Sequence, residues 1–395
     1  MTVYLNFINY MFKFSSAFFL IIYTAIFSLA QDNIFPTHFE TKANYAYLMD
    51  YDSGAVLFDK EGNTKMVPSS MTKIMTTYIV FDKLKNGGLK LTDQFIVSAN
   101  ASKKDGSKMF IAPNQQVTIE ELLNGVIVLS GNDACIALAE GLYGSEAAFV
   151  EKMNSEAKKL GLNNTVFKNS NGWPDEGHLT SARDLAVLSS ELIKQFPEYY
   201  HYHSNKQYSF NNIKQNNRNS LIGIGGVDGI KTGKTDIGGY GIVISAKRDA
   251  RRLIAVINGL KTEKERMEEA EKILNYGFIN FKNLHLFTGN KQVIKAKVIY
   301  GVKSEVFLNV KDEVIVTVPA EYDRIKDMVF ITEFHEPIEA PLLKGEVVGK
   351  LKILSAKDKI LIKEVDLVAD EDVKKSGPIK SIFQSIKYFF SKKVS

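Results

Sequence analysis

The order of strand-like and helix-like segments in residues 40–280 constrains the fold of this chain more than any other feature. Residues 45–58 alternate around the turn Asp52-Ser53-Gly54, which is typical of two paired strands. Two further strand-like runs, 240–246 and 253–258, lie at the other end of the region. Because strands must be paired, we expect an α+β sandwich in which one antiparallel sheet unites both ends of the region.

The segments between these strands have the periodicity and caps of helices. From Pro68 onward, apolar side chains follow the i, i+3, i+4, i+7, i+8 spacing of a helix packed on a core, at Met71, Ile74, Met75, Tyr78 and Ile79. Caps and spacing predict further helices over about 118–129, 133–141, 145–161, 181–196 and 263–276. These helices would cover the sheet and bury its apolar faces.

After about Asn283 the pattern changes to short strands punctuated by glycines. The strand-like runs are 292–298, 305–310, 313–318, 329–333, 346–354 and 360–368. They predict a small all-β domain, in which we find no group of histidines or carboxylates that would form a site. The chain thus divides into four predicted parts, namely 1–30, 31–282, 283–372 and 373–395.

The N-terminal segment 1–30 departs from this globular pattern. It carries one charge, Lys13, ahead of an apolar run, and it ends on Ser28-Leu29-Ala30. A basic start, a short apolar run and a small-x-small site are typical of a secretory signal peptide. An uncleaved membrane anchor is the alternative, although the apolar run is short for a span of about 20 residues.

The C-terminal segment 373–395 is predicted to be a linker followed by an amphipathic helix over 378–395. Apolar residues recur at helical spacing and lysines carry the charge, at Ile379, Ile382, Phe383, Ile386, Phe389 and Phe390 and at Lys380, Lys387, Lys392 and Lys393. Such a helix is too short and too charged to span a bilayer, but it can lie in the interface on anionic head groups. Packing of its apolar stripe on the preceding domain is the alternative.

Composition excludes several classes of protein. With 45% apolar and 24% charged residues, the chain is ordinary globular protein rather than disordered or disulfide-stapled. The single cysteine, Cys135, allows neither an intramolecular disulfide nor a cysteine-based metal site. The net charge of +5 is small, and the six histidines lack zinc-binding spacing. We therefore expect no metal, no cofactor and no nucleic-acid partner.

Three short motifs remain that could carry chemistry, namely Ser70-Met71-Thr72-Lys73, Ser130-Gly131-Asn132 and Lys231-Thr232-Gly233. Each is common by itself, since Ser155-Glu156-Ala157-Lys158 and Ser98-Ala99-Asn100 repeat two of the patterns. The order, spacing and placement of the three motifs distinguish them from these two further matches. The first begins a helix, the second links two helices, and the third opens the strand region at a sheet edge.

The first motif is suited to a nucleophile and its base. Ser70 and Lys73 lie one turn apart at a helix start, so their side chains share a face. The lysine can hydrogen-bond the hydroxyl, and the helix N-terminus favours an alkoxide. A lysine acts as a base only when a useful fraction is neutral. Burial and a second cation, for which Lys231 is the candidate, would lower its pKa.

The other two motifs are suited to substrate contacts. Ser130 is expected to expose a hydroxyl that could pass a proton to a leaving amine, and Asn132 can donate to and accept from a substrate amide. Lys231 and Thr232 suit a substrate carboxylate, and Gly233 would let a substrate backbone approach closely. Together the motifs indicate nucleophilic catalysis on a peptide with a free carboxylate.

On these residues the chain closely resembles the D-alanyl-D-alanine carboxypeptidases, low-molecular-weight penicillin-binding proteins of the penicillin-recognising serine peptidase family. The similar segments are 68–76, 130–134, 227–233 and 169–174 (Asn-Ser-Asn-Gly-Trp-Pro), with His178 and Asp184 after the last. The resemblance extends over nearly the whole chain after residue 30. It implies a serine β-lactamase/transpeptidase-like sandwich, followed by a β-domain and an amphipathic tail.

The resemblance also implies roles for particular residues. Ser70 would be acylated, Lys73 would be the general base, and Ser130 would help to pass the proton. Lys231 and Thr232 would hold the terminal carboxylate of the substrate.

Further implied contacts surround this carboxylate and the reacting carbonyl. The backbone N–H groups of Ser70 and Lys234 would form the oxyanion hole, in which one donor contributes about 2.7–4 kcal/mol. Arg218 and Arg266 are further candidates for carboxylate contact, which surface salt bridges explain equally well. Familiar members of the family have histidine where this chain has Lys234, so we expect a different charge beside the site.

The implied activity is removal of the terminal D-alanine from peptidoglycan stem peptides through an acyl-enzyme, with β-lactams acylating the same serine. The implied location is the periplasmic face of the inner membrane, reached by export and held by 378–395. A β-lactamase, a D,D-endopeptidase and a non-enzymatic β-lactam sensor are the alternatives. The β-lactamase would need a Glu-x-x-Leu-Asn segment before Lys231, whereas Glu271-Lys272-Ile273-Leu274-Asn275 follows it. The sensor would need several spanning helices.

Overall fold

The computed structural model describes residues 39–287, 291–322 and 327–391. The predicted signal segment 1–30 lies outside the described residues. The described chain separates into two units, one over Phe39–Lys282 and one from Asn283 onward. Each unit has its own apolar core, and each is described by itself below.

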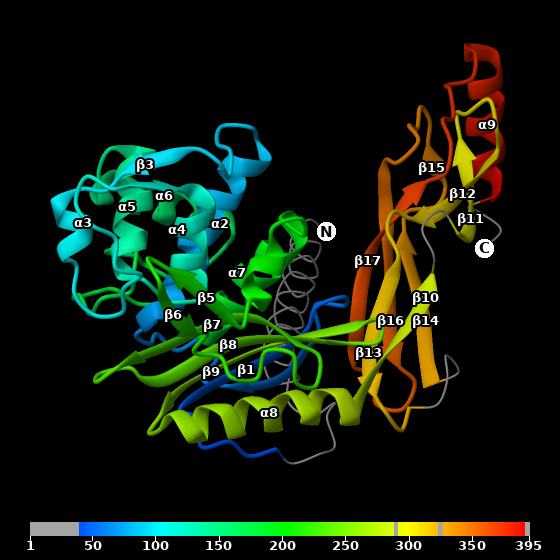
Figure 1. Cartoon of the computed structure of the whole chain (residues 1–395). Helices are drawn as coiled ribbons and strands as arrows, with labels where there is room; N and C mark the ends of the chain where they lie inside the picture. Colours follow the sequence, from blue (N-terminus) through cyan, green and yellow to red (C-terminus); the bar gives the residue numbers. More distant parts are fainter. Residues whose placement is uncertain (1–38, 288–290, 323–326, 392–395) are drawn as a thin grey trace, which may run out of the picture. The chain divides into compact units, whose positions relative to one another are not determined.

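The first unit is built on a five-stranded antiparallel sheet with the order β2-β1-β9-β8-β7 (Figure 1). The strands are β1 (Tyr45–Asp50), β2 (Val56–Lys60), β7 (Val227–Thr235), β8 (Gly239–Arg248) and β9 (Arg251–Leu260). β1 pairs with β9 along its whole length, with Leu48 opposite Ala255. One antiparallel sheet therefore unites the two ends of the unit, which confirms the predicted α+β sandwich.

Helices cover both faces of this sheet. Figure 1 shows α7 (Ala182–Gln195) on one face and α8 (Glu263–Asn280) on the other. Every residue from Leu253 to Ile257 of β9 is fully buried, although successive side chains point to opposite faces of the sheet. The central strand of a sheet that helices cover on both faces must be apolar on both sides, and β9 is that strand.

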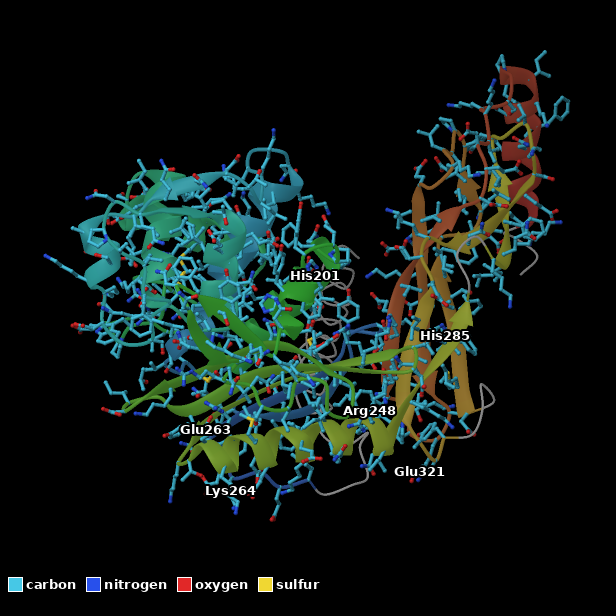
Figure 2. The ribbon with its side chains drawn as sticks, in the orientation of Figure 1. His201, Arg248, Glu263, Lys264, His285 and Glu321 are labelled. Carbon is cyan, nitrogen blue, oxygen red and sulfur yellow. The ribbon has the colours of Figure 1, made fainter. Side chains whose placement is uncertain are left out.

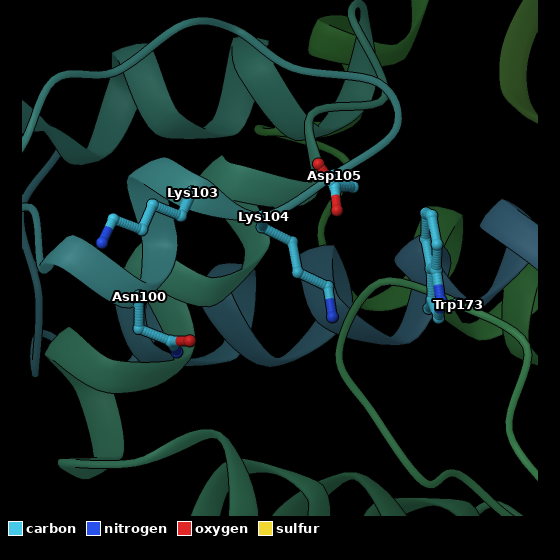
Figure 3. A pocket seen from close by; sticks show the side chains of 5 residues that line it. All are labelled: Asn100, Lys103, Lys104, Asp105 and Trp173. Carbon is cyan, nitrogen blue, oxygen red and sulfur yellow. The ribbon is translucent and has the colours of Figure 1, made fainter.

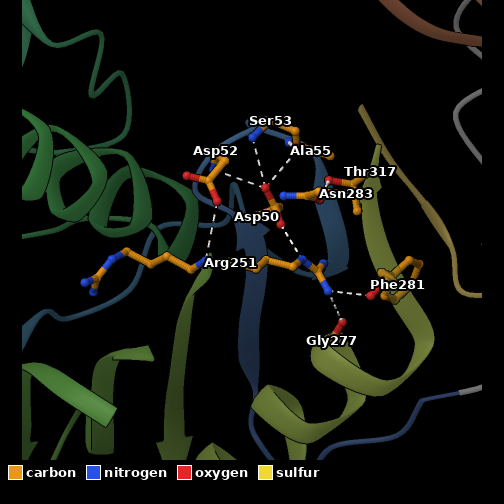
Figure 4. Close-up of polar contacts among 10 residues, drawn as sticks. Asp50, Asp52, Ser53, Ala55, Arg251, Gly277, Phe281, Asn283 and Thr317 are labelled. Atoms are coloured by element: carbon orange, nitrogen blue, oxygen red, sulfur yellow. Dashed lines mark hydrogen bonds and ion pairs between the residues drawn. The ribbon is translucent and has the colours of Figure 1, made fainter. Parts of the chain in front are cut away.

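One arginine ties the sheet to the end of α8, as Figure 4 shows. Asp50, at the end of β1, accepts hydrogen bonds from the backbone N–H groups of Asp52 and Ser53 and so closes the β1–β2 turn. The other Asp50 oxygen accepts from Arg251 Nε at 2.7 Å. Arg251 Nη1 also donates to the Gly277 carbonyl oxygen near the end of α8. A cation at a helix C-terminus satisfies carbonyls that the helix leaves free.

The other helices of the unit form a cluster around α2. They are α2 (Lys73–Lys85), α3 (Ala99–Lys103), α4 (Ile119–Ile127), α5 (Asn132–Tyr143) and α6 (Glu146–Lys159). The predicted capping box of Thr118 and Glu121 is present at the start of α4. α2 differs from its prediction, because its apolar stripe predicted one buried face whereas all residues from Lys73 to Phe81 are buried. α4, α5, α6 and α7 contact α2 from several sides, so its threonines are buried with its apolar residues.

Short elements complete the first unit. They are the 3₁₀ turns η1 (Ser69–Thr72) and η2 (Tyr200–Ser204) and the two-stranded ribbons β3 (Gln94–Ile96) with β4 (Gln116–Thr118) and β5 (Gln207–Phe210) with β6 (Ile213–Asn216). η1 matters most for the site, because it leads directly into α2 and carries Ser70.

In the residues that the structure describes from Asn283 onward, the second unit is all-β apart from one helix, as predicted. Its strands are β10 (Phe281–Phe287), β11 (Gln292–Ile299), β12 (Glu305–Val310), β13 (Val314–Pro319), β14 (Met328–Phe334), β15 (Ile338–Glu339), β16 (Val347–Ser355) and β17 (Leu361–Ala369). Six form the sheet β14-β16-β17-β12-β11-β15, and β10 pairs with β13. The sequence did not predict β10, whose apolar residues are interrupted by polar ones, or β15, which is too short to show a period.

The helix α9 (Pro378–Ser391) follows the β-sheet and uses polar side chains to contact it. Gln384 Nε2 donates to the Gly301 carbonyl oxygen at 3.3 Å, and Lys380 Nζ donates to the Val302 carbonyl oxygen at 2.8 Å. The apolar side chains of Ile379 and Phe383 are 73% and 69% exposed. Within the residues that the structure describes, no helix is both long and apolar enough to cross a membrane.

Candidate active site

The site begins at η1, where glycines allow two other segments to pack against the backbone around Ser70. A Cβ atom on Gly172 would lie 1.8 Å from the Ser69 carbonyl oxygen, and Gly172 has φ +81°. A Cβ atom on Gly233 of β7 would lie 3.0 Å from the Pro68 carbonyl oxygen. The missing side chain of Gly233 makes room for the turn that carries the nucleophile. The close approach of substrate that was expected at Gly233 stays a prediction.

Lys73 is fully buried and makes three hydrogen bonds, one for each N–H of its ammonium. Its Nζ lies 3.0 Å from Ser70 Oγ, 2.8 Å from Asn132 Oδ1 and 2.6 Å from the Asn171 carbonyl oxygen. The structure therefore brings the first two motifs together around one nitrogen atom. Asn171 belongs to the 169–174 segment, but the sequence assigned it no contact, because a backbone carbonyl has no residue-type signature.

Burial is the main cause that lowers the pKa of Lys73 from 10.5 to about 8. The Asp133 carboxylate acts in the opposite direction, and the Lys104 ammonium lowers the pKa further. Lys231 was expected to be a second cation beside Lys73, and the two lysines are coupled, since the charge of Lys73 lowers the pKa of Lys231. Lys104 is a further cation near Lys73 that the sequence did not single out.

The Ser130–Asn132 link is held from both sides. The N–H of Gly131 donates to the Gly125 carbonyl oxygen, and the N–H of Asn132 donates to the Ser107 carbonyl oxygen. Ser130 adopts φ +58°, and the residue as a whole is 4% exposed. The expected role of its hydroxyl in passing a proton stays a prediction. The side-chain oxygen of Asn132 accepts a hydrogen bond from Lys73, and its Nδ2 donates one to the Asp105 carbonyl oxygen.

Two buried polar groups support the site, although no role was predicted for either of them from the sequence. The Asp133 carboxylate accepts backbone N–H bonds from Met109, Phe110, Ile111 and Ala134 and so holds residues 109–111 against α5. His178 Nε2 lies 3.0 Å from Thr72 Oγ1 of η1. Burial lowers the pKa of His178 to about 4, so its ring is neutral at pH 7.

Lys231 and Thr232 lie on the edge strand β7, where the sequence placed them, and are 4% and 5% exposed. Lys231 Nζ donates to the Thr232 carbonyl oxygen at 3.2 Å. Burial and the charges of Lys73, Arg266 and Arg218 hold the pKa of Lys231 well below its usual range. Within the described residues Lys231 has no carboxylate partner. A buried cation with cationic neighbours is a site for an anionic group.

The two arginines that the sequence singled out differ in burial. Arg266 is 3% exposed and forms an ion pair of 2.8 Å with Glu263, which Figure 2 labels at the start of α8. Its Nη2 also donates to the carbonyl oxygen of Arg218 at 3.4 Å, whereas the Arg218 side chain belongs to an exposed residue. Both charges lower the pKa of Lys231.

Lys234 follows the third motif and lies at the surface. Its ammonium pairs with Asp236 Oδ1 at 3.0 Å, and its side chain is 51% exposed. This ion pair raises the pKa of Lys234, so the residue is a permanent surface cation at the end of β7. Glu271, considered for a β-lactamase, lies at an exposed position of α8.

The assembled site contains a serine hydroxyl that is hydrogen-bonded to a buried lysine of lowered pKa. It also contains a second buried lysine, which has no anionic partner among the described residues. This pairing can accept a proton at one position and an anion at the other. No group of three or more His, Cys, Asp or Glu residues that could hold a metal ion occurs in the described parts of the chain.

Comparison with known proteins gives the same class. Residues 31–262 match the model of the D-alanyl-D-alanine carboxypeptidase family, and residues 281–375 match the model of the penicillin-binding protein 5 C-terminal domain. The chain is 40% identical over 340 residues to the D-alanyl-D-alanine carboxypeptidase DacC of Escherichia coli, which covers 84% of each chain. It is 36% identical over 346 residues to DacF of Bacillus subtilis, which covers 85% of this chain and 87% of that one.

A solved structure agrees with these relatives. Penicillin-binding protein 5 from Haemophilus influenzae is 37% identical, with a TM-score of 0.82, over 86% of this chain and 100% of that one. The chain therefore belongs to the D-alanyl-D-alanine carboxypeptidase family of penicillin-binding proteins. Its activity is that of a D-Ala-D-Ala carboxypeptidase.

Proposed function

We propose that this carboxypeptidase works through an acyl-enzyme on Ser70, with Lys73 as the general base. The observation that carries the proposal is the 3.0 Å hydrogen bond between Lys73 Nζ and Ser70 Oγ, together with the lowered pKa of Lys73. With a pKa of about 8, roughly one lysine in ten is neutral at pH 7, which is enough for a general base.

The hydrogen-bond partners of Lys73 support this direction of proton transfer. Neutral Lys73 retains two N–H donors, which match the Asn132 Oδ1 and Asn171 carbonyl acceptors. Its lone pair is then left for the hydroxyl proton of Ser70. The two fixed acceptors would orient the nitrogen before the reaction, which is the geometric condition for general-base catalysis.

The proposed reaction has two steps. Ser70 Oγ bonds to the carbonyl carbon of the penultimate D-alanine as its proton passes to Lys73. The C–N bond to the terminal D-alanine then breaks, and the leaving amine takes the proton with help from Ser130. Water hydrolyses the ester, and β-lactams would acylate the same oxygen.

We assign the remaining residues to binding. Lys231 and Thr232 would hold the carboxylate of the terminal D-alanine, with Arg266 and Arg218 adding positive potential. Asn132 would orient the substrate amide. Gly233 would keep β7 close to η1, so that the backbone N–H groups of Ser70 and Lys234 donate to the developing oxyanion. The peptidoglycan stem peptide is the proposed physiological substrate.

Mass spectrometry after incubation with penicillin tests the mechanism. We expect one covalent adduct on the peptide containing Ser70, and release of D-alanine from a peptide ending in D-Ala-D-Ala. Ser70→Ala should lose both reactions and retain the wild-type circular dichroism spectrum. A folded wild-type protein with an adduct elsewhere, or with no adduct, would contradict the role of Ser70.

We further propose that the protein is exported through cleavage after residue 30, with a peptidase domain over 31–282, a β-domain over 283–372 and a membrane-surface segment over 373–395. The polar contacts of α9 support the last part. Gln384 and Lys380 contact the β-unit, whereas the side chains of Ile379 and Phe383 remain exposed. An amphipathic helix docked for stability would bury its apolar face instead.

Vesicle flotation tests this segment. The protein lacking 378–395 should stay unbound to vesicles that contain anionic lipid, whereas the chain from residue 31 to 395 should float with them. Both forms should release D-alanine from a soluble peptide at the same rate. Equal flotation of the two forms would show that α9 is not the anchor.

A further inference from the structure

A hollow of about 240 Å³ opens beside the site, and it is lined by Asn100, Lys103, Lys104, Asp105 and Trp173 (Figure 3). In this view Lys104 extends toward the space beside the Trp173 ring, and Asp105 lies above the end of Lys104. The Lys104 ammonium lies 5.5 Å from the centre of that ring. Trp173 is 42% exposed, so part of its surface is available to a ligand.

The hollow is joined to the catalytic groups through Asn132. Asn132 Nδ2 donates to the carbonyl oxygen of Asp105 at 2.7 Å, while its Oδ1 accepts from Lys73. A Cβ atom on Gly106 would lie 2.7 Å from Asn132 Nδ2 and 2.9 Å from Trp173 Cζ3. The Trp173 ring and the Asn132 amide are therefore separated by the thickness of one glycine backbone.

The 169–174 segment also fixes the position of Trp173. Its N–H donates to the side-chain oxygens of Asn169 and Asn171, and its carbonyl oxygen accepts from Asn169 Nδ2. The carbonyl oxygen of Asn171, two residues earlier, accepts from Lys73. The wall of the hollow is thus held by the same segment that holds the base, and a ligand would meet a preformed surface.

The hollow adjoins Asn132, which contacts Lys73, whereas the proposed carboxylate pocket is at Lys231. Lys104 is among the charges that act on Lys73, and Arg266 and Arg218 are among those that act on Lys231. If the terminal D-alanine sits at Lys231, the peptide that precedes the scissile bond extends past Asn132. The first long side chain in that direction belongs to the residue before D-Ala-D-Ala.

The charges in the hollow are of both signs. Within the described residues, neither the Lys104 ammonium nor the Asp105 carboxylate forms a salt bridge. A ligand with only a negative charge would be repelled by Asp105. A ligand with only a positive charge would be repelled by Lys104 and Lys103. A side chain that ends in both a carboxylate and an ammonium group satisfies both, and its methylene stem can cover the Trp173 ring.

We propose that this hollow is a specificity subsite for a zwitterionic side chain on the residue before D-Ala-D-Ala. Its carboxylate binds Lys104, its ammonium binds Asp105, and its aliphatic stem lies on Trp173. The inference rests on the proposed function, because it takes the direction of the substrate from the Ser70 and Lys231 roles.

Three peptides that differ in one residue test the subsite. The residue before D-Ala-D-Ala is meso-diaminopimelate, with both terminal groups, lysine, with the ammonium alone, or 2-aminopimelate, with the carboxylate alone. We expect the wild-type kcat/KM to be about 10-fold higher for diaminopimelate than for either other peptide. The ratio between two peptides cancels any effect on the chemical step, since all three use the same Ser70 and Lys73.

Variants assign the two charges separately. Lys104→Ala should remove most of the preference for diaminopimelate over lysine, and Asp105→Asn should remove most of the preference over 2-aminopimelate. Trp173→Leu should lower kcat/KM for all three peptides, through the loss of the shared stem contact. Lys158→Ala, an exposed lysine of α6, is the matched control and should change no ratio.

The outcomes separate the subsite from the catalytic proposal. Equal kcat/KM for the three peptides, or ratios that Lys104→Ala and Asp105→Asn leave unchanged, would overturn the subsite while the carboxypeptidase mechanism stands. If none of the peptides is hydrolysed and Ser70 is not acylated by penicillin, the mechanism fails and the subsite fails with it.

Discussion

The two units of the chain use charged residues in opposite ways. In the first unit Lys73, Asp133, Lys231 and Arg266 are all less than 5% exposed. In the second unit the ion pairs lie at the surface, as in Lys295 with Glu305, whose side chains are 51% and 47% exposed. A buried charge must be compensated by fixed partners or by a ligand, whereas a surface charge is compensated by water. The chemistry is therefore concentrated where burial makes charge costly.

Lys73→Arg gives the largest expected effect and tests whether a buried charge of lowered pKa is what the site needs. Arginine remains protonated and cannot accept the Ser70 proton, so kcat/KM for a D-Ala-D-Ala peptide should fall by about 10³-fold or more. Stopped-flow measurement of penicillin acylation should show the same loss. The fluorescence of Trp173, the single tryptophan, reports whether the first unit is still folded. Retention of a tenth of the wild-type rate would contradict the base role.

Asp133→Ala tests most directly whether a buried charge of the first unit matters more for stability than a surface charge of the second unit. It would leave the backbone N–H groups of Met109 and Phe110 buried without their acceptor, which should lower the free energy of unfolding by about 3 kcal/mol. Denaturant titration followed by Trp173 fluorescence measures it. Glu305→Ala, in a surface pair of the second unit, should cost less than about 1 kcal/mol by calorimetry. Equal losses would show that burial does not separate the two units.

Lys231→Met should remove the discrimination between a peptide with a free terminal carboxylate and the same peptide as an amide. The wild type should prefer the carboxylate by about 100-fold in kcat/KM, since a buried cation without a partner binds an anion strongly. The variant should hydrolyse both peptides at similarly low rates. A preference that survives in Lys231→Met would move the carboxylate site to Arg266 or Arg218.

The pH profile gives the smallest expected effect and sharpens the description of Lys73. The neutral form is the active one, so kcat/KM should rise with pH up to a midpoint of about 8 and fall about tenfold per pH unit well below it. Lys104→Ala removes a positive charge that lowers the pKa of Lys73, so the midpoint should move to higher pH. A midpoint that moves to lower pH, or a profile that is flat from about pH 6 to about pH 9, would contradict this electrostatic account.

Much of the fold could be predicted from local pattern. The helix caps at Thr118 and Ser181, the β8–β9 hairpin and the strand-rich second unit all have period or turn chemistry that acts within a few residues. β15 was not predicted, because it pairs in parallel with β11, which is distant in the sequence. The burial of α2 on all sides was not predicted, because threonines on a helix are expected to be exposed unless the packing around them is known.

The sequence by itself determined the α+β class, the all-β second unit, the family and the order of the three motifs, because these depend on residue type and short spacing. Only the tertiary structure decided what surrounds each motif. It placed the Asn171 carbonyl oxygen on Lys73, buried Ser130, gave Gly233 its packing role against η1, and set Lys104 and Trp173 beside Asn132. Backbone carbonyls, burial and charges brought together from distant segments leave no local pattern, and they are the terms that set the pKa of a buried lysine and the shape of a subsite.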